Sequence, residues 1–322
     1  MTPRPLEDLA ARARRVLIDE YRMKVASLVH LATHSNVLFR VDLADGRRLV
    51  LRVSEPLSNT RSNIDLEVAW LSELARDPDL LVVTPVATPD GRLVTDLATG
   101  RHGHRPCVLF KWVPGDPMGE GSGPFGYRAM GRLSSQLHGH GDWRPPDPQR
   151  LRRWDRTFYY PPQIDPVVIE DFRYDHLFSG RRALLRKAAE RSDLFLRRRW
   201  AEGEPMVVHG DLHEFNVHLY VGRAWAIDFE DLMLAYPSQD IATSLYGART
   251  RADLDQVIQA FRSGYEEHRP WPVLGRLELE VYWAARQVML MNHAAQILTQ
   301  QEAESYFDRV TPWLESFMAR LG

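Results

Sequence analysis

Polar side chains that can hold a metal and a phosphate gather in two short stretches of the sequence. The first stretch is His209–Asn216, which reads HGDLHEFN, and the second is Asp228–Asp231. The carboxylates of Asp211 and Asp228 and the amide of Asn216 offer the oxygen ligands that a magnesium ion prefers. We therefore expect these three residues to serve a magnesium ion and a phosphate group.

Short apolar runs of the β type border both polar stretches. They are Val207–Val208, Val217–Tyr220 and Trp225–Ile227, with a turn between the last two. An order of strand, polar loop, strand, turn, strand and polar loop would bring the two carboxylates and the amide to one end of a small sheet. The pattern thus predicts one small sheet that positions the site.

Two other interpretations of local motifs remain open. His209, Asp211 and His213 alternate, so on a strand they would share one face and would form a zinc site, as in a zinc hydrolase. Gly121–Gly126 satisfies the G-x-G-x-x-G pattern of dinucleotide-binding folds. That pattern also needs a parallel second strand, whereas a loop rich in Trp and Pro, Gly141–Pro146, follows here. We interpret the glycine-rich stretch as a linker.

The first third of the chain has the pattern of an antiparallel sheet with one inserted helix. Val37–Leu43 alternates apolar and polar residues, Asp45-Gly46 is a hairpin turn, and Arg47–Val53 returns as the partner strand. In that strand Arg52 points to the face opposite Leu51 and Val53. Further strand candidates are Leu80–Val86, Arg92–Thr95 and Pro106–Val113, and the predicted helices are Pro5–Tyr21 and Asn63–Arg76.

Helical periodicity dominates after Pro114. The predicted helices are Phe125–Leu137, Ser179–Trp200, Ser238–Tyr246, Ala252–Glu267, Leu277–Leu298 and Gln301–Leu321. This change of pattern predicts two lobes, with residues 1–113 as a sheet lobe and residues 114–322 as a helical lobe. No internal repeat is visible.

Composition indicates an ordinary globular protein. Hydrophobic residues make up 44% and charged residues 26%, and the formal net charge of −2 does not point to a nucleic-acid partner. The single cysteine, Cys107, excludes an internal disulfide and suits a reducing cytosol. No apolar run is long enough to cross a bilayer, and the N-terminus lacks the apolar core of a signal peptide. We therefore expect a cytoplasmic protein without a membrane partner.

Three motifs together resemble one enzyme superfamily. They are His209-Gly210-Asp211 with Asn216, then Ile227-Asp228-Phe229, then Asp240-Ile241-Ala242. The sequence resembles the superfamily of aminoglycoside phosphotransferases, choline kinases and homoserine kinases, and the resemblance covers most of the chain. It implies an α+β, two-lobed protein-kinase-like fold, with a small antiparallel-sheet N-lobe and a larger, mainly helical C-lobe. The N-lobe would bind the nucleotide, and the C-lobe would carry the catalytic loop and the acceptor site.

The resemblance assigns roles to the residues of the two polar stretches. Asp211 would accept or orient the proton of the attacking hydroxyl, and Asn216 and Asp228 would hold Mg²⁺ on the phosphates of ATP. His213 falls where protein kinases carry a lysine that meets the transferred phosphate, so it would donate to that phosphate or tie the loop together. His209 and Asp240 would anchor the loop.

In the sheet lobe the superfamily pairs a strand lysine with a helix glutamate. Here the strand offers Arg52 and the helix offers Glu67, so an arginine would bind the nucleotide phosphates. This departure leaves open a weakened or non-catalytic nucleotide-binding protein. The resemblance also places Ser35 and Asn36 in the loop over the phosphates. It places Phe110–Val113 at the hinge, where Lys111 and Val113 would meet the adenine.

The acceptor is a small molecule in our first interpretation, because glycine after His209 is the small-molecule pattern. An amino alcohol, a sugar or an aminoglycoside would suit this role. A protein Ser/Thr substrate is the alternative. Glu230 and Asp231 would attract a cationic acceptor or would be structural. Tyr282, Trp283 and Arg286 are candidates for lining the acceptor pocket, although core packing is the favoured role for the two aromatic residues.

Overall fold

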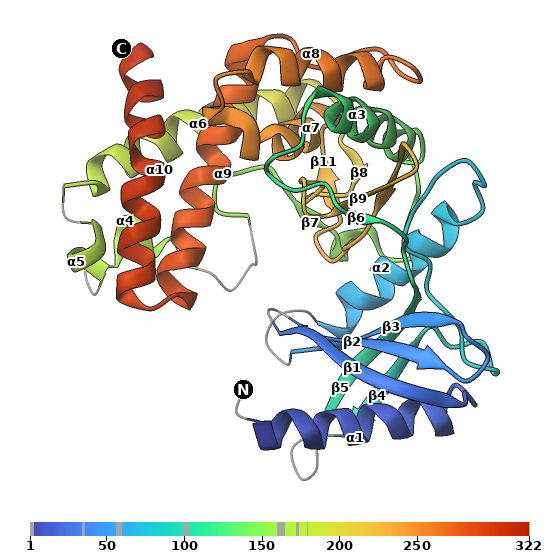
Figure 1. Ribbon diagram of the computed structural model, residues 1–322. Coiled ribbons are helices and arrows are strands. Elements are labelled where there is room, and N and C mark those ends of the chain that lie inside the picture. The colour runs from blue at the N-terminus through green and yellow to red at the C-terminus, as the bar shows by residue number, and fades with distance from the viewer. Residues whose placement is uncertain are drawn as a thin grey trace. The chain divides into compact units, whose positions relative to one another are not determined.

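The protein forms two compact units, shown as ribbons in Figure 1. The structure, a computed structural model, describes residues 3–33, 36–55, 60–98, 103–159, 165–171, 174–178 and 180–321. The first unit consists of Met1–Pro117, Arg144–Leu151 and Val217–Glu230, and the second consists of Met118–Trp143, Arg152–Asn216 and Asp231–Gly322. The predicted boundary after residue 113 assigns residues 144–151 and 217–230 to the second lobe. The structure places both segments in the first unit.

An antiparallel sheet of five strands forms the centre of the first unit, in the order β1-β2-β3-β5-β4. The strands are β1 (Val25–Thr33), β2 (Asn36–Leu43), β3 (Arg48–Ser54), β4 (Val94–Ala98) and β5 (His104–Lys111). The predicted hairpin at Asp45-Gly46 connects β2 to β3, and Gly46 has the positive φ of 86° that such a turn needs. Arg52 therefore lies on the middle strand of the sheet.

The alternation of side chains gives the sheet two different faces. The core of the first unit contains odd-numbered residues of the central strands, such as Phe39, Leu51 and Leu109, packed with helix α1 (Pro3–Asp19). Cys107 lies on this face and is buried, and burial raises the pKa of its thiol to about 12. Arg52 lies on the opposite face, as predicted, because successive side chains of a strand alternate.

Helix α2 (Arg61–Leu74) is the helix inserted between β3 and β4. Its N-cap is Thr60, whose hydroxyl accepts the N–H of Asn63 at 3.2 Å. This cap satisfies one of the orphan donors of the first turn. The helix buries Glu67 and Trp70, and the Trp70 ring packs edge-on against Phe229 with centroids 5.5 Å apart.

The expectation of one small sheet around the motif is wrong. Two three-stranded sheets occur instead, β10-β9-β6 in the first unit and β7-β11-β8 in the second. The strands are β6 (Asp116–Pro117), β7 (Arg152–Arg153), β8 (Met206–Val208), β9 (Val217–Tyr220), β10 (Arg223–Ala226) and β11 (Met233–Ala235). Strand β8 pairs with β11, which follows the second polar stretch, and not with β9.

Eight α-helices are described in the second unit, and every helix predicted there is present within a few residues. They are α3 (Pro124–Gly139), α4 (Val167–Glu170), α5 (Asp175–Phe178), α6 (Arg182–Glu202), α7 (Pro237–Leu245), α8 (Leu254–Tyr265), α9 (Arg276–Ile297) and α10 (Gln300–Arg320). Within the described ranges, two 3₁₀ turns lie between helices along the chain, η1 (Pro148–Arg150) in the first unit and η3 (Gly247–Thr250) in the second. None of the helices in the described ranges has the length and apolar character needed to span a bilayer.

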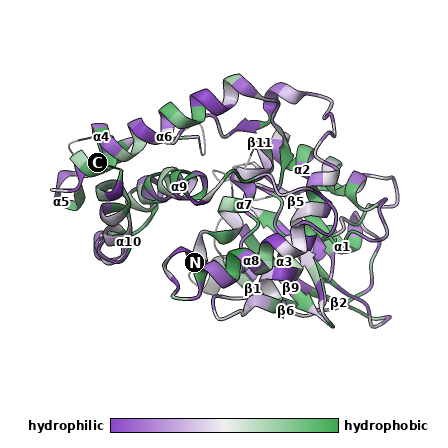
Figure 2. Ribbon diagram, turned by 90° about the horizontal axis from the view of Figure 1, so that it is seen from above, coloured by the Kyte–Doolittle hydropathy of each residue, from purple (hydrophilic) through white to green (hydrophobic). Residues whose placement is uncertain are grey.

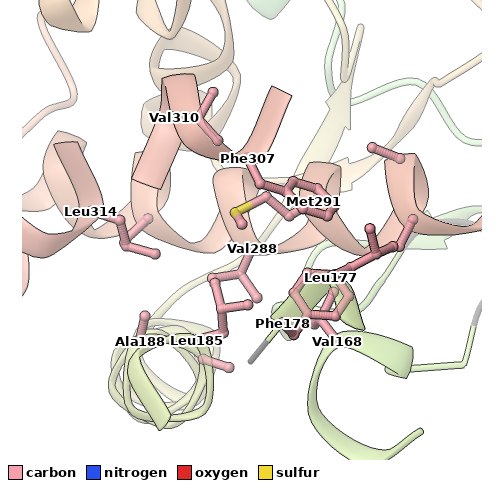
Figure 3. Close-up of a cluster of buried hydrophobic side chains, with 14 of the residues drawn as sticks. Val168, Leu177, Phe178, Leu185, Ala188, Val288, Met291, Phe307, Val310 and Leu314 are labelled. Atoms are coloured by element: carbon pink, nitrogen blue, oxygen red, sulfur yellow. The ribbon is translucent and has the colours of Figure 1, made fainter. Parts of the chain in front are cut away.

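A hydrophobic cluster holds α6, α9 and α10 together with the short helices α4 and α5. Figure 3 shows Leu185 of α6, Val288 and Met291 of α9, and Phe307 and Leu314 of α10 meeting in this cluster. Hydrophilic residues alternate with the hydrophobic ones along α6 (Figure 2). This amphipathic pattern produces the helical periodicity from which the sequence predicts the helix.

Helices α3 and α8 approach each other closely through two glycines. A Cβ atom on Gly131 would lie 2.0 Å from the carbonyl oxygen of Phe261, and one on Gly264 would lie 1.9 Å from that of Arg128. Side chains at these positions would force the helices apart. The crossing is therefore specified by glycine.

Two sequence predictions about the connecting segments meet different outcomes. Leu80–Val86 forms no strand, only isolated bridges from Val82 to Ala226 and from Pro85 to Phe110. The glycine-rich stretch before α3 follows β6, which pairs antiparallel with β9. A dinucleotide-binding fold would need a parallel pair at this point. The structure therefore does not support the dinucleotide-binding alternative for this stretch.

Candidate active site

The loop 209–216 follows β8, and its beginning is closely packed. Gly210 has φ of 82°, and a Cβ atom there would lie 2.2 Å from the carbonyl oxygen of Asp231. Glycine alone suits this combination of left-handed backbone and close approach. The Gly210 N–H donates to Oδ1 of Asp240 at 2.8 Å, and Oδ2 of Asp240 lies 3.0 Å from Nε2 of His138. Asp240 therefore fixes the loop backbone, as expected.

His209 contributes to the same anchoring. It is fully buried, and its Nδ1 accepts the N–H of Asp211 at 3.2 Å. In the part of the chain that the structure describes, no group of three or more His, Cys, Asp or Glu side chains is placed to hold a metal ion. The zinc site considered for His209, Asp211 and His213 thus receives no support.

The carboxylate of Asp211 is oriented by three side chains of the second unit. Nη2 of Arg286, on α9, donates to Oδ1. Nε2 of His213 lies 3.3 Å from Oδ2, and Nδ2 of Asn216 lies 3.4 Å from it. Burial raises the pKa of Asp211, but the charge of Arg286 and the hydrogen bond with His213 outweigh burial and hold the pKa well below its usual range. Asp211 is therefore ionised at neutral pH.

His213 bridges the loop. Its Nδ1 accepts the N–H of Phe215 at 3.1 Å, so Nε2 carries the proton that faces Asp211 in the neutral ring. Burial lowers the pKa of His213, but the hydrogen bond and charge of Asp211 outweigh burial and raise it. Nδ2 of Asn216 also donates to the carbonyl oxygen of Asp211 at 2.9 Å. The loop thus presents Asp211, His213 and Asn216 as one connected group.

A cavity of about 740 Å³ opens beside this group within the second unit. Gly210, Asp211 and His213 line one side of it. Other walls come from α9, α10 and η3, with Arg286, Tyr306 and Arg249 among the lining residues. We call it the acceptor cavity from here on, after the acceptor site that the sequence resemblance predicts in the C-lobe.

In the first unit, Arg52 and Glu67 form the predicted strand–helix pair. Nη1 of Arg52 donates to Oε1 of Glu67 at 2.8 Å, and Nη2 donates to Oε2. Both side chains are buried. A second carboxylate, Glu230, lies 3.4 Å from Nη1 of Arg52 and accepts a hydrogen bond from Nδ2 of Asn36 at 2.6 Å. Burial lowers the pKa of Arg52, but the charges of Glu67 and Glu230 outweigh burial and raise it.

A second cavity, of about 330 Å³, lies over this buried group within the first unit. Five of the predicted nucleotide-site residues line it, namely Asn36, Arg52, Glu67, Lys111 and Val113. Apolar side chains such as Leu38, Val50 and Phe110 form the rest of its wall. Ser35, also predicted for this site, lies outside the described residues.

Asp228 also lines the cavity of the first unit. Its φ is 62°, in the left-handed region that few residues other than glycine adopt, although aspartate tolerates it better than most. Such strained positions concentrate at functional sites. The structure thus gathers the predicted residues into two groups, with Asp228 in the first unit and Asp211, His213 and Asn216 in the second.

A family model decides the identity of the fold and the class of enzyme. The model of the phosphotransferase enzyme family matches residues 29–303, which is most of the chain. The chain belongs to the phosphotransferase enzyme family. This membership confirms the predicted resemblance, and the chain is accordingly a phosphotransferase.

Several solved structures share the fold of this phosphotransferase. An amicoumacin kinase in complex with AMP-PNP and Ca²⁺ matches with a TM-score of 0.77 and 16% identity, covering 98% of this chain and 96% of that chain. A microcompartment-associated aminopropanol kinase has a TM-score of 0.72 and 22% identity, with coverages of 96% and 94%. A spectinomycin phosphotransferase bound to ADP and spectinomycin has a TM-score of 0.67 and 16% identity, with coverages of 96% and 98%. A comparison with curated protein sequences gives no significant match.

The neighbours confirm the predicted fold class of this phosphotransferase, an α+β kinase-like fold with an antiparallel N-terminal sheet and a helical C-terminal region. The sequence missed some contacts in the candidate site. Glu230 and Asp231 were candidates either for attracting a cationic acceptor or for a structural role. In the structure Glu230 forms an ion pair with Arg52 and accepts a hydrogen bond from Asn36. Asp231 accepts a hydrogen bond from Arg152. One signal was present: a guanidinium has five N–H donors, more than one carboxylate can accept, so Arg52 in place of lysine needs further acceptors.

Proposed function

We propose that this phosphotransferase moves the γ-phosphate of ATP to a hydroxyl of a small-molecule acceptor, with Mg²⁺ on the phosphates. One observation carries the proposal: Asp211 is ionised, fixed by Arg286 and His213, and lines a cavity in the second unit. A volume of about 740 Å³ is typical of pockets for small ligands. The names of the structural neighbours, which are kinases of amicoumacin, aminopropanol and spectinomycin, support an acceptor of this size.

The chemistry needs little basicity from Asp211. The acceptor oxygen forms a bond to the γ-phosphorus as the bond from that phosphorus to the leaving oxygen of ADP breaks. The hydroxyl proton passes to Asp211, whose low pKa makes it a weak base but an ionised and oriented one. Because phosphoryl transfer has a loose transition state, orientation of the hydroxyl matters more than early deprotonation. His213, through Nε2–H, is the proposed donor to the transferred phosphate.

The nucleotide occupies the cavity of the first unit in this proposal. Its apolar wall suits the faces of an adenine ring, and Arg52 is the proposed phosphate-binding cation. The backbone N–H of Lys111 already donates to the carbonyl oxygen of Thr84 at 2.9 Å. The hinge contacts with adenine would therefore use the carbonyl of Lys111 and the N–H of Val113. Ser35 and Asn36 remain proposed donors to the phosphates.

Asn216 and Asp228 are the proposed oxygen ligands of Mg²⁺. The contacts of Asn216 with Asp211 use Nδ2, so Oδ1 is the amide atom that can ligate a cation. Amide and carboxylate oxygens fit a hard divalent ion. Bound Mg²⁺ would neutralise charge on the phosphates during transfer.

Replacement of Asp211 tests the assignment directly. Asp211→Asn should lower acceptor-dependent ATP consumption by about 10²–10⁴-fold, the usual contribution of a positioned acid or base. ATP affinity measured by calorimetry should stay within about twofold, because Asp211 does not line the cavity of the first unit. Undiminished turnover by the variant would show that Asp211 is not the base.

Two alternatives give different results in the same assays. A non-catalytic nucleotide-binding protein would bind ATP and Mg²⁺ without consuming ATP in the presence of any acceptor. A protein Ser/Thr kinase would label a protein substrate and ignore small hydroxyl compounds.

A further inference from the structure

The charges around the acceptor cavity are unevenly satisfied. Besides the pair of Asp211 with Arg286, two lining residues have partners of opposite charge in the second unit. Asp231 accepts from Arg152, and both carboxylate oxygens of Asp253 lie 2.8 Å from nitrogens of Arg251. These groups are compensated before any ligand binds. The remaining charges of the wall are therefore the ones that can recognise a ligand.

Arg249, on η3, is a half-buried cation without an acidic partner among the described residues. Its Nη atoms donate to neutral oxygens, the carbonyl of Tyr246 at 2.9 Å and Oε1 of Gln287 at 3.2 Å. Its Nε is buried and has no hydrogen-bond partner in the described structure. The guanidinium lies 3.7 Å from the ring centroid of Tyr246, which holds it in place. A charge this fixed and uncompensated favours an anionic ligand.

A second cation lies on the same wall. Arg309, on α10, is exposed and lines the cavity, with its guanidinium 5.6 Å from the ring centroid of Tyr306. It too has no acidic partner among the described residues. Arg249 and Arg309 thus add positive charge to one wall, and no carboxylate among the described residues of the second unit lies within ion-pair distance of either.

Glu214 is the opposite case. Its side chain is only 5% exposed and lines the cavity, and its Oε2 is buried without a hydrogen-bond partner in the described structure. A Cβ atom on Gly247 would lie 2.1 Å from Oε1 of Glu214, so the carboxylate packs against η3, two residues before Arg249. An uncompensated carboxylate and an uncompensated guanidinium therefore flank the same short segment.

We propose that the acceptor is zwitterionic, with an ammonium group bound by Glu214 and a carboxylate bound by Arg249, in addition to the hydroxyl that is phosphorylated. The proposal rests on the proposed function, because it assigns the acceptor to this cavity. Its new element is the carboxylate, which the planar guanidinium of Arg249 suits by geometry and charge. Arg309 strengthens the attraction from the exposed side.

Four probes on one six-carbon polyhydroxyl scaffold separate the two charges. They are D-glucitol without charge, D-glucosamine in its reduced open-chain form (2-amino-2-deoxy-D-glucitol) with the ammonium, D-gluconate with the carboxylate, and D-glucosaminic acid with both. Calorimetry on the full chain should give the lowest Kd for D-glucosaminic acid, about tenfold below that for D-glucosamine or D-gluconate. D-glucosamine binding as tightly as D-glucosaminic acid, or no binding by any probe at millimolar concentration, would overturn the proposal.

Single substitutions assign each charge to its residue. Arg249→Gln should abolish the advantage of D-glucosaminic acid over D-glucosamine, and Arg249→Lys should restore part of it. Glu214→Gln should abolish its advantage over D-gluconate. Arg262→Gln, at an exposed arginine of α8 outside the cavity lining, is the control and should change neither ratio. Unchanged ratios in both cavity variants would overturn the assignment.

Two features keep this test decisive. If Arg249→Gln does not fold, Arg309→Gln, at an exposed residue, should reduce the advantage of D-glucosaminic acid over D-glucosamine by at least about twofold. Since the assay measures binding, it does not depend on turnover. If the protein binds D-glucosaminic acid with the expected preference but consumes no ATP, the proposed function is contradicted. If it phosphorylates purely cationic acceptors and shows no preference for D-glucosaminic acid, the zwitterionic acceptor is contradicted.

Discussion

Arg286 donates a hydrogen bond from Nη2 to Oδ1 of Asp211, although 75 positions of sequence separate the two residues. The proposed base is therefore oriented by helix α9 as well as by its own loop. Both side chains are largely buried, so the guanidinium acts on the carboxylate with little screening by water.

Removal of Arg286 should shift the pH dependence of the reaction. Asp211 has a lowered pKa in the folded protein, so it is ionised above that pKa and loses its charge as the pH falls through it. In Arg286→Met the pKa of Asp211 rises, and the acidic limb of kcat/KM should move to higher pH by at least about one unit. Arg286→Lys should move it less. Superimposable pH–rate profiles would show that Arg286 does not set this pKa.

Asp240 should act on turnover through the loop. Asp240→Asn keeps the size of the side chain but removes the negative charge that accepts the Gly210 N–H and faces His138. We expect kcat to fall about tenfold or more, since hydrogen bonds to charged groups are worth more than neutral ones. KM for ATP should change little. Asp255→Asn, on an exposed acid of α8, is the control for loss of one charge, and equal effects in the two variants would contradict the anchoring role.

The buried pair in the first unit should be important for stability. Glu67→Gln leaves the buried Arg52 cation with the more distant Glu230, at 3.4 Å, as its remaining ion-pair partner among the described residues. We expect the free energy of unfolding to fall by about 3 kcal/mol in urea titration, the usual cost of breaking a buried ion pair. Asp65→Asn on the same helix breaks an exposed pair with Arg61 and should have little effect. A small effect of Glu67→Gln would show that Arg52 is held by Glu230 alone.

The glycine crossing of α3 and α8 should be intolerant of a methyl group. Gly131→Ala places Cβ 2.0 Å from the Phe261 carbonyl oxygen, so the helices must separate, at a cost of about 1–3 kcal/mol in unfolding free energy. Gly139→Ala is a matched control on the same helix, because no atom lies within 4 Å of a Cβ there. Chemical denaturation of both variants checks the difference. Equal stability would mean that the helices adapt without cost.

Much of the fold was readable from local periodicity. Val217–Tyr220 was predicted with its observed bounds because a glycine turn separates two β-type runs. Helices α6, α9 and α10 follow from apolar stripes that pack into one cluster. Leu80–Val86 has the apolar character of a strand, but strand formation also needs partners, and there it finds only isolated bridges. Strand pairing depends on the tertiary structure. This also explains why local patterns did not predict the pairing of β8 with β11.

The candidate site was predicted in its loop but not in its environment. The spacing of Asp211 and Asn216 identified the loop because those residues are close in sequence. Glu214 and Arg249 carried no pattern, since their importance depends on which charges lack partners after folding. Arg286 was a candidate for the acceptor pocket, yet its bond to Asp211 joins distant elements that no local window connects.

The buried thiol of Cys107 has a practical consequence for measurement. With its pKa raised to about 12 and no exposure, this thiol forms almost no thiolate at neutral pH and does not react readily with maleimides. The native sequence thus already serves as an unreactive background for site-specific labelling. A cysteine introduced at Thr250, an exposed residue of the acceptor cavity, would carry a single fluorophore and would report ligand entry in real time.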